Sequence, residues 1–73
     1  MKIQLLSCDA AKPNRRGIAK MLEEIADHVD AASARELTDI LLDGTEIDIE
    51  VSHSTSSAFR ALRKLKIDYE IMD

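Results

Sequence analysis

A strict alternation of acidic and apolar residues constrains the fold of this chain more than any other feature. Segment 46–51 reads EIDIEV, which places three acids on one face of a strand and three aliphatic side chains on the other. Segment 67–71 repeats the alternation, with Ile67, Tyr69 and Ile71 separated by two acids. Strands of this kind belong to a sheet with one solvated and one buried face, so a second layer must cover the apolar side.

Helical spacing of apolar residues predicts the layer that covers this side. A first helix is expected over residues 15–29, with Asn14 as its N-cap. Gly17 lies in its first turn, where we expect little weakening of the helix. The apolar stripe of this helix consists of Ile18, Met21, Leu22, Ile25 and Val29.

Two further helices are predicted. The second begins at Ser33, which has the capping-box spacing to Glu36, and ends at Asp43-Gly44. Its inward residues are expected to be Ala34, Leu37, Ile40 and Leu41. The third helix follows the hydroxyl-rich segment 52–57, and its apolar stripe consists of Ala58, Phe59, Leu62 and Leu65.

The order of the elements predicts the topology. Residues 2–7 form a first strand with Ile3 and Leu5 on one face, which gives the order β-α-α-β-α-β in a single domain, residues 1–73. The second and third strands then run in the same direction, so a wholly antiparallel sheet needs the first strand between them. The predicted fold is a two-layer α+β sandwich with strand order 2-1-3 and three helices on one face of the sheet.

Composition excludes several classes of function. The chain has 73 residues, 45% of them hydrophobic, and a formal net charge of −4, which argues against a general binder of polyanions. Two aromatic residues are too few for a base-stacking platform, and a single cysteine excludes an internal disulfide or a multi-cysteine metal site. The sequence shows neither an apolar run of membrane-spanning length nor a signal peptide, so we expect a cytoplasmic protein without membrane association.

Charge is divided unevenly along the chain. Residues 1–20 carry five basic side chains and one acid, whereas residues 21–54 carry ten acids and one base. Arg15 and Arg16 open the first predicted helix, where the helix dipole disfavours cations, so helix stability does not explain their presence. Surface balance and a partner-binding patch remain as explanations. The patch would comprise Lys12, Arg15, Arg16 and Lys20.

The arrangement of reactive side chains does not predict an enzyme. Cys8 and His53 lie near strand ends at opposite ends of the predicted sheet, too far apart for a nucleophile and its base. His28 and His53 lack the spacing of a metal site. The hydroxyl cluster at 52–57 lacks the glycines of a phosphate-binding loop, which favours a capping role. We therefore expect no catalytic residues, no metal and no cofactor.

Several short segments of the sequence resemble the C-terminal domain of the bacterial ribosomal stalk protein, whose fold is shared by the protease adaptor ClpS. Asn14-Arg15 is similar to the Asn-Lys that opens the first helix of the stalk domain, and Lys20 is similar to a lysine midway along that helix. The other similar positions are Ala31 to Leu37, Val51-Ser52 and Asp68 to Ile71. The resemblance covers nearly the whole chain and implies the same α+β fold.

The resemblance also implies a function. In the stalk family, basic and apolar residues of the first two helices recruit the G domains of translation factors. Carried over to this chain, that role implies an acidic, translation-related protein partner and an interface made of Arg15, Arg16, Ala19, Lys20 and Arg35. In ClpS, a loop after the first strand reads the N-terminal residue of a substrate, and Asp9 is the residue here that matches this loop.

The leading hypothesis is a small interaction module that docks an acidic protein partner through the basic surface of the first two helices. One alternative is nucleic-acid binding through the same surface together with Arg60, Arg63, Lys64 and Lys66. A ClpS-like protease adaptor is another, and an acyl- or metabolite-binding enzyme subunit has no residue in its favour. Acids on both outer strands oppose edge-to-edge pairing, so we expect a monomer or a weak dimer.

Overall fold

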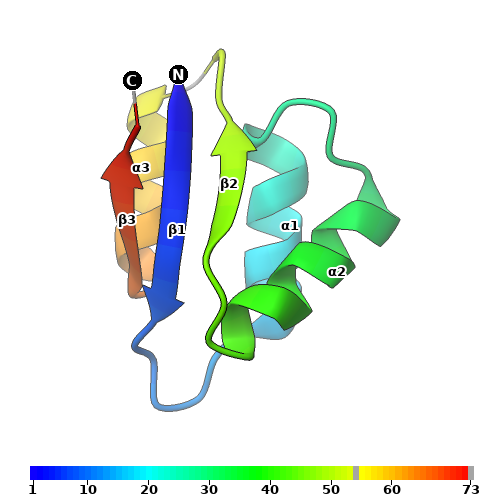
Figure 1. Cartoon of the computed structure of the whole chain (residues 1–73), viewed down its shortest axis with the longest axis vertical. Coiled ribbons are helices and arrows are strands. Elements are labelled where there is room, and N and C mark those ends of the chain that lie inside the picture. Colours follow the sequence, from blue (N-terminus) through cyan, green and yellow to red (C-terminus); the bar gives the residue numbers. More distant parts are fainter. Residues whose placement is uncertain (54, 73) are drawn as a thin grey trace.

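Three strands and three helices form two layers in the computed structural model, which describes residues 1–53 and 55–72 (Figure 1). The elements are β1 (Lys2–Cys8), α1 (Arg15–Ile25), α2 (Ala31–Leu42), β2 (Ile47–Glu50), α3 (Thr55–Lys64) and β3 (Ile67–Ile71). Both outer strands pair antiparallel with β1, in the order β2-β1-β3, and the helices cover one face of the sheet. The predicted α+β fold and strand order are confirmed.

The central strand supplies the deepest part of the core. Ile3 and Leu5 of β1 are completely buried. A β-bulge at Leu6 interrupts the pairing with β3 and shifts the alternation of side chains by one residue. Cys8 therefore returns to the side of the sheet that carries the helices, where it packs against the core and its thiol donates to the carbonyl oxygen of Leu65 at 3.5 Å.

Each helix buries one apolar stripe against the sheet. The stripes of α1 and α3 follow the predicted periodicity, whereas α2 differs. The buried helical side chains are Ile18, Met21, Leu22 and Ile25 of α1, Ala34, Thr38 and Leu41 of α2, and Ala58 and Leu62 of α3. Across residues 1–53 and 55–72, no helix has the length and apolar character needed to cross a membrane.

The connection between α1 and α2 departs from the prediction. The predicted first helix forms, but its expected end at residue 29 is wrong, because α1 ends at Ile25. Asp27 directs its backbone N–H toward β2 and donates to the carbonyl oxygen of Glu50 at 2.8 Å. His28 then adopts a left-handed φ of 61°, which prevents further helix. A contact between segments distant in sequence thus ends α1 before its apolar periodicity does.

The start of α2 differs from the prediction as well. The N-cap is Asp30, whose Oδ1 accepts the backbone N–H of Ser33 at 2.8 Å, so the expected capping box at Ser33 is wrong. Hydrogen bonds from Ser33 hold the pKa of Asp30 below its ordinary value of 3.8. The buried face of α2 runs through Thr38 and Leu41, and Ile40 is 41% exposed, which corrects its expected inward position.

Candidate functional site

A side-chain cap fixes the start of α1 and the place of two arginines. Asn14 Oδ1 accepts the backbone N–H of Gly17 at 3.0 Å, as predicted for an N-cap. Arg15 and Arg16 follow in the first turn of α1, which contains no acidic residue. Because cations are unfavourable at this end of a helix, the two arginines do not stabilise α1.

The packing of α1 against α2 forms a groove among the predicted interface residues. The groove has a volume of about 340 Å³ and is lined by Arg15, Arg16, Ala19, Arg35, Thr38 and Asp39. Half-buried Ala19 and buried Thr38 form its floor, and the three exposed arginines form its rim. The Thr38 hydroxyl donates to the carbonyl oxygen of Ala34 at 2.7 Å, so it is satisfied within α2. The recognition chemistry of this groove therefore resides in its guanidinium groups.

One of the three arginines is paired across the groove. Arg15 of α1 forms an ion pair and hydrogen bond with Asp39 of α2, and both side chains are about two-thirds exposed (65% and 67%). Within residues 1–53 and 55–72, Arg16 and Arg35 form no ion pair, so the rim keeps a net positive charge. A surface pair such as Arg15–Asp39 contributes little to stability, so an anionic group that enters the groove can exchange with Asp39.

The structure brings together four of the five predicted interface residues. Arg15, Arg16, Ala19 and Arg35 line the groove, whereas Lys20 is exposed on α1 and does not line it. Thr38 and Asp39 also line the groove and were not predicted from the sequence. Their spacing of three and four residues from Arg35 places all three on one side of α2, which is the signal that could have identified them.

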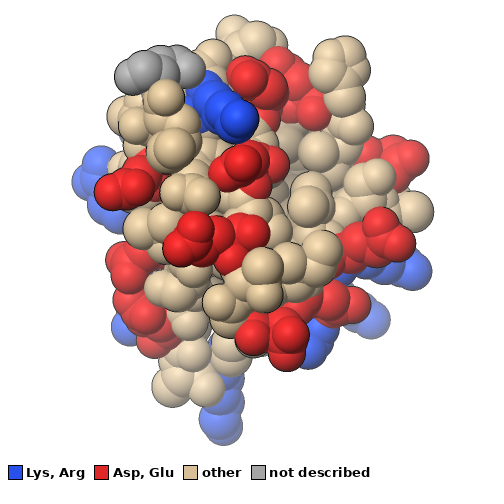
Figure 2. Space-filling view, in the orientation of Figure 1, with Lys and Arg blue, Asp and Glu red and all other residues tan. Residues whose placement is uncertain are grey.

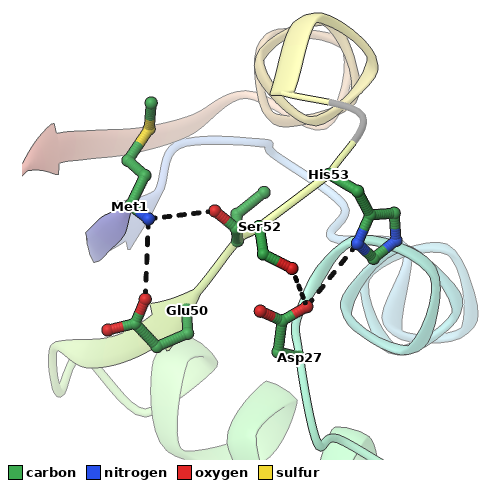
Figure 3. Close-up of polar contacts among 6 residues, drawn as sticks. Met1, Asp27, Glu50, Ser52 and His53 are labelled. Carbon is green, nitrogen blue, oxygen red and sulfur yellow. Dashed lines mark hydrogen bonds and ion pairs between the residues drawn. The ribbon is translucent and has the colours of Figure 1, made fainter.

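Cys8 and His53 are held by separate structural contacts. Cys8 is the last residue of β1 and His53 follows β2, and these antiparallel strands finish at opposite ends of the sheet (Figure 1). His53 Nδ1 lies 3.6 Å from Asp27 Oδ1, which also accepts the Ser52 hydroxyl at 3.0 Å (Figure 3). Asp27 therefore joins the α1–α2 connection to the segment that follows β2.

The N-terminal amine lies near the same end of the sheet. The amine of Met1 donates to the carbonyl oxygen of Val51 at 3.1 Å and lies 3.7 Å from Glu50 Oε2 (Figure 3). These contacts fix the start of β1 against the end of β2. Among the residues that the structure describes, no three His, Cys, Asp or Glu side chains come together as metal ligands would.

The open face of the sheet has the opposite charge to the groove. Its exposed acids are Asp48 and Glu50 of β2 and Asp68 and Glu70 of β3. Figure 2 shows this face, with acidic side chains spread over the strands and most basic side chains at the margins. Asp9 lies beside Asp68, and their shared hydrogen bond and mutual repulsion raise the pKa of Asp9.

The open sheet face and the groove are made by different layers of the fold. The sheet contributes the acidic face, while α1 and α2 contribute the arginine-lined groove.

Comparison with protein-family models, curated proteins and solved structures finds no match to this chain.

Proposed function

We propose that this chain is a small, non-enzymatic interaction module that docks an acidic segment of a protein partner in the groove between α1 and α2. The observation that carries the proposal is the gathering of Arg15, Arg16 and Arg35 around a concave floor made by Ala19 and Thr38. Guanidinium groups bind carboxylates through two parallel hydrogen bonds, which gives both charge and geometry to the contact. Lys20, exposed one turn after Arg16 on α1, adds positive charge beside the groove.

Asp39 occupies the position beside Arg15 that a partner carboxylate would take, so a partner would bind by displacing Asp39 from Arg15. Its carboxylate already binds Arg15, which is the kind of contact that a partner's aspartate or glutamate would make. A partner carboxylate that replaces Asp39 would keep Arg15 paired while it gains contacts with Arg16 and Arg35. The partner therefore needs at least two acidic side chains close together to compete with Asp39.

The two charged layers favour one orientation of such a partner. An acidic segment is attracted to the arginine rim and repelled by the acids on the open sheet face. Complementary charges of this kind speed encounter and suppress wrong orientations more than they raise affinity. The resemblance to the stalk domain supports the same surface and suggests a cytoplasmic, translation-related partner.

Affinity capture from native lysate tests the proposal. The wild type is compared with R16E/R35E, which reverses the groove, and with R60E/R63E, which makes the same change of charge on α3. We expect a discrete protein to be retained by the wild type and by R60E/R63E and lost with R16E/R35E. Circular dichroism of each variant verifies that the domain remains folded. Retention of the same protein by R16E/R35E would refute docking in the groove.

Nuclease treatment separates this proposal from the nucleic-acid alternative. Arg60, Arg63, Lys64 and Lys66 would contribute to nucleic-acid binding, so that alternative predicts weaker capture by R60E/R63E and a steep loss with salt. If nuclease releases the captured material, nucleic-acid binding is the better account. If the captured protein stays bound after nuclease and is lost with R16E/R35E, the groove is its docking site.

A further inference from the structure

Within residues 1–53 and 55–72, the outer edge of β3 has no neighbouring strand. β3 is an outer strand that pairs with β1 on one side (Figure 1). Just beyond β3, the Met72 N–H donates to the carbonyl oxygen of Lys2 at 2.8 Å. In an antiparallel pair, residues alternate between those that bond the neighbouring strand and those that direct their N–H and C=O away from it. Tyr69 and Ile71 therefore direct these groups outward, away from β1.

The side chains along this edge differ between the two faces of the sheet. On the helix-covered face, the Tyr69 ring stacks on Phe59 of α3, with centroids 5.4 Å apart and an angle of 19° between the ring planes. Farther along the same side, Ile71 is 52% exposed. The edge therefore offers an apolar row that the helices cover only in part.

The open face of the same strand is acidic. Asp68 and Glu70 are exposed and alternate with the apolar row. These charges argue against a second copy of this chain at the edge. In every antiparallel register that pairs at least three residues of each β3 strand and keeps the apolar rows together, an acid faces an acid across the new interface, which is destabilising.

We propose that the β3 edge binds an extended peptide segment in which basic and apolar residues alternate, added to the sheet as a fourth strand. Its backbone pairs with Tyr69 and Ile71, its basic side chains lie opposite Asp68 and Glu70, and its apolar side chains continue the row formed with Phe59. This site uses a different surface from the arginine groove, so it is independent of the proposed function.

Peptide titrations followed by amide NMR shifts test this proposal. The probe is an acetylated heptapeptide amide of alternating lysine and valine, and its control has glutamate in place of lysine. We expect the largest shifts at the amides of Tyr69 and Ile71, and affinity for the glutamate control at least about tenfold weaker. Absence of binding, or shifts confined to the groove between α1 and α2, would overturn the proposal.

N-methylated probes distinguish strand addition from attraction by charge alone. Directly opposite residues lie on the same face of a sheet, so the valine amides are those that bond Tyr69 and Ile71, while the lysine amides point away. N-methylation of the valine amides should abolish binding, and N-methylation of the lysine amides should preserve it. Equal effects of the two modifications would show that backbone pairing is not the mode of binding, and would refute the proposal.

Variants of the protein provide a second test. I71P removes an N–H that points away from β1, so the hydrogen bonds between β3 and β1 are retained. The added peptide loses a backbone partner at the free edge, so I71P should weaken binding of the lysine probe. D68K/E70K should weaken binding of the lysine probe by at least about tenfold, whereas D48K/E50K on the opposite outer strand serves as the charge-matched control. Equal weakening by both double variants would overturn the placement at β3. If I71P does not fold, the methylated probes still decide. Probe-independent dimerisation of the wild type through β3 would contradict the choice of partner.

Discussion

Substitution of Gly17 by alanine provides a sharp test of how α1 begins. Glycine within a helix usually costs about 1 kcal/mol relative to alanine, so Gly17→Ala would ordinarily stabilise the domain. In this structure a Cβ at position 17 would lie 2.7 Å from Asn14 Nδ2 and 2.9 Å from Asn14 Cγ. These distances are too short for the cap to stay in place, so the Asn14 side chain must move.

The magnitude follows from the two opposing contributions. Loss of an asparagine N-cap costs about 1 kcal/mol, whereas the gain in helix propensity at this first-turn position is at most about 1 kcal/mol. We therefore expect Gly17→Ala alone to leave the free energy of unfolding unchanged or slightly lower. In the background of Asn14→Ala, which has no cap to displace, the same substitution should stabilise the domain by nearly the full propensity gain.

A double-mutant cycle measures this difference. Urea denaturation of the wild type, N14A, G17A and N14A/G17A gives four free energies of unfolding, and we expect a coupling energy of about 1 kcal/mol between the two positions. Equal stabilisation by G17A in both backgrounds would refute the reasoning, because it would show that a Cβ at 17 does not disturb the cap. The cycle also concerns function, since this turn carries Arg15 and Arg16.

Three further predictions test the groove, the start of α2 and the core. Asp39→Asn should release Arg15 for the partner and increase affinity by up to about fivefold, observed as elution of the captured protein at higher salt; elution at lower salt would contradict it. Because hydrogen bonds lower the pKa of Asp30, its contribution to stability is present above its ordinary pKa of 3.8 and lost as the pH falls through the lowered value. Thermal unfolding of D30N should therefore depend less on acid pH than that of the wild type, and equal pH dependence would show that Asp30 is not the source. Leu22→Ala should cost about 3 kcal/mol in urea denaturation because Leu22 is completely buried, and a cost below about 1 kcal/mol would contradict the core assignment.

The fold could be predicted where local periodicity and topology agree. The alternation over 46–51 and 67–71 predicts both outer strands, and the order of elements requires β1 between them. The end of α2 could also be predicted, because Gly44 adopts a left-handed φ of 94° after the helix. The N-cap of α2 at Asp30 was missed although its contact with Ser33 is local, whereas the error at the end of α1 arises where distant segments meet. Asp27 bonds to Glu50 across the molecule and ends α1 early, which no local pattern of residues 15–29 indicates.

The arginines of the candidate site were predicted from the sequence, whereas the residues that α2 adds beside them were not. Arg15 and Arg16 are conspicuous in the sequence because they are cations at a helix N-terminus, and the resemblance to the stalk domain added Arg35. The contribution of Thr38 and Asp39 depends on how α2 is rotated against α1. That rotation is set by which side chains of α2 are buried, and the buried face runs through Thr38 instead of the predicted Ile40.

Site-directed photo-crosslinking tests most directly whether the groove docks an acidic protein segment. A photo-reactive amino acid at Lys20, which is exposed beside the groove, is compared with the same group at Arg60 on α3, and the crosslinked peptides are identified by mass spectrometry. We predict that position 20 crosslinks to a partner segment rich in aspartate and glutamate, and that Arg16→Glu with Arg35→Glu abolishes the product. Crosslinking at position 60 alone, or a position-20 product that persists after these reversals, would contradict docking in the groove.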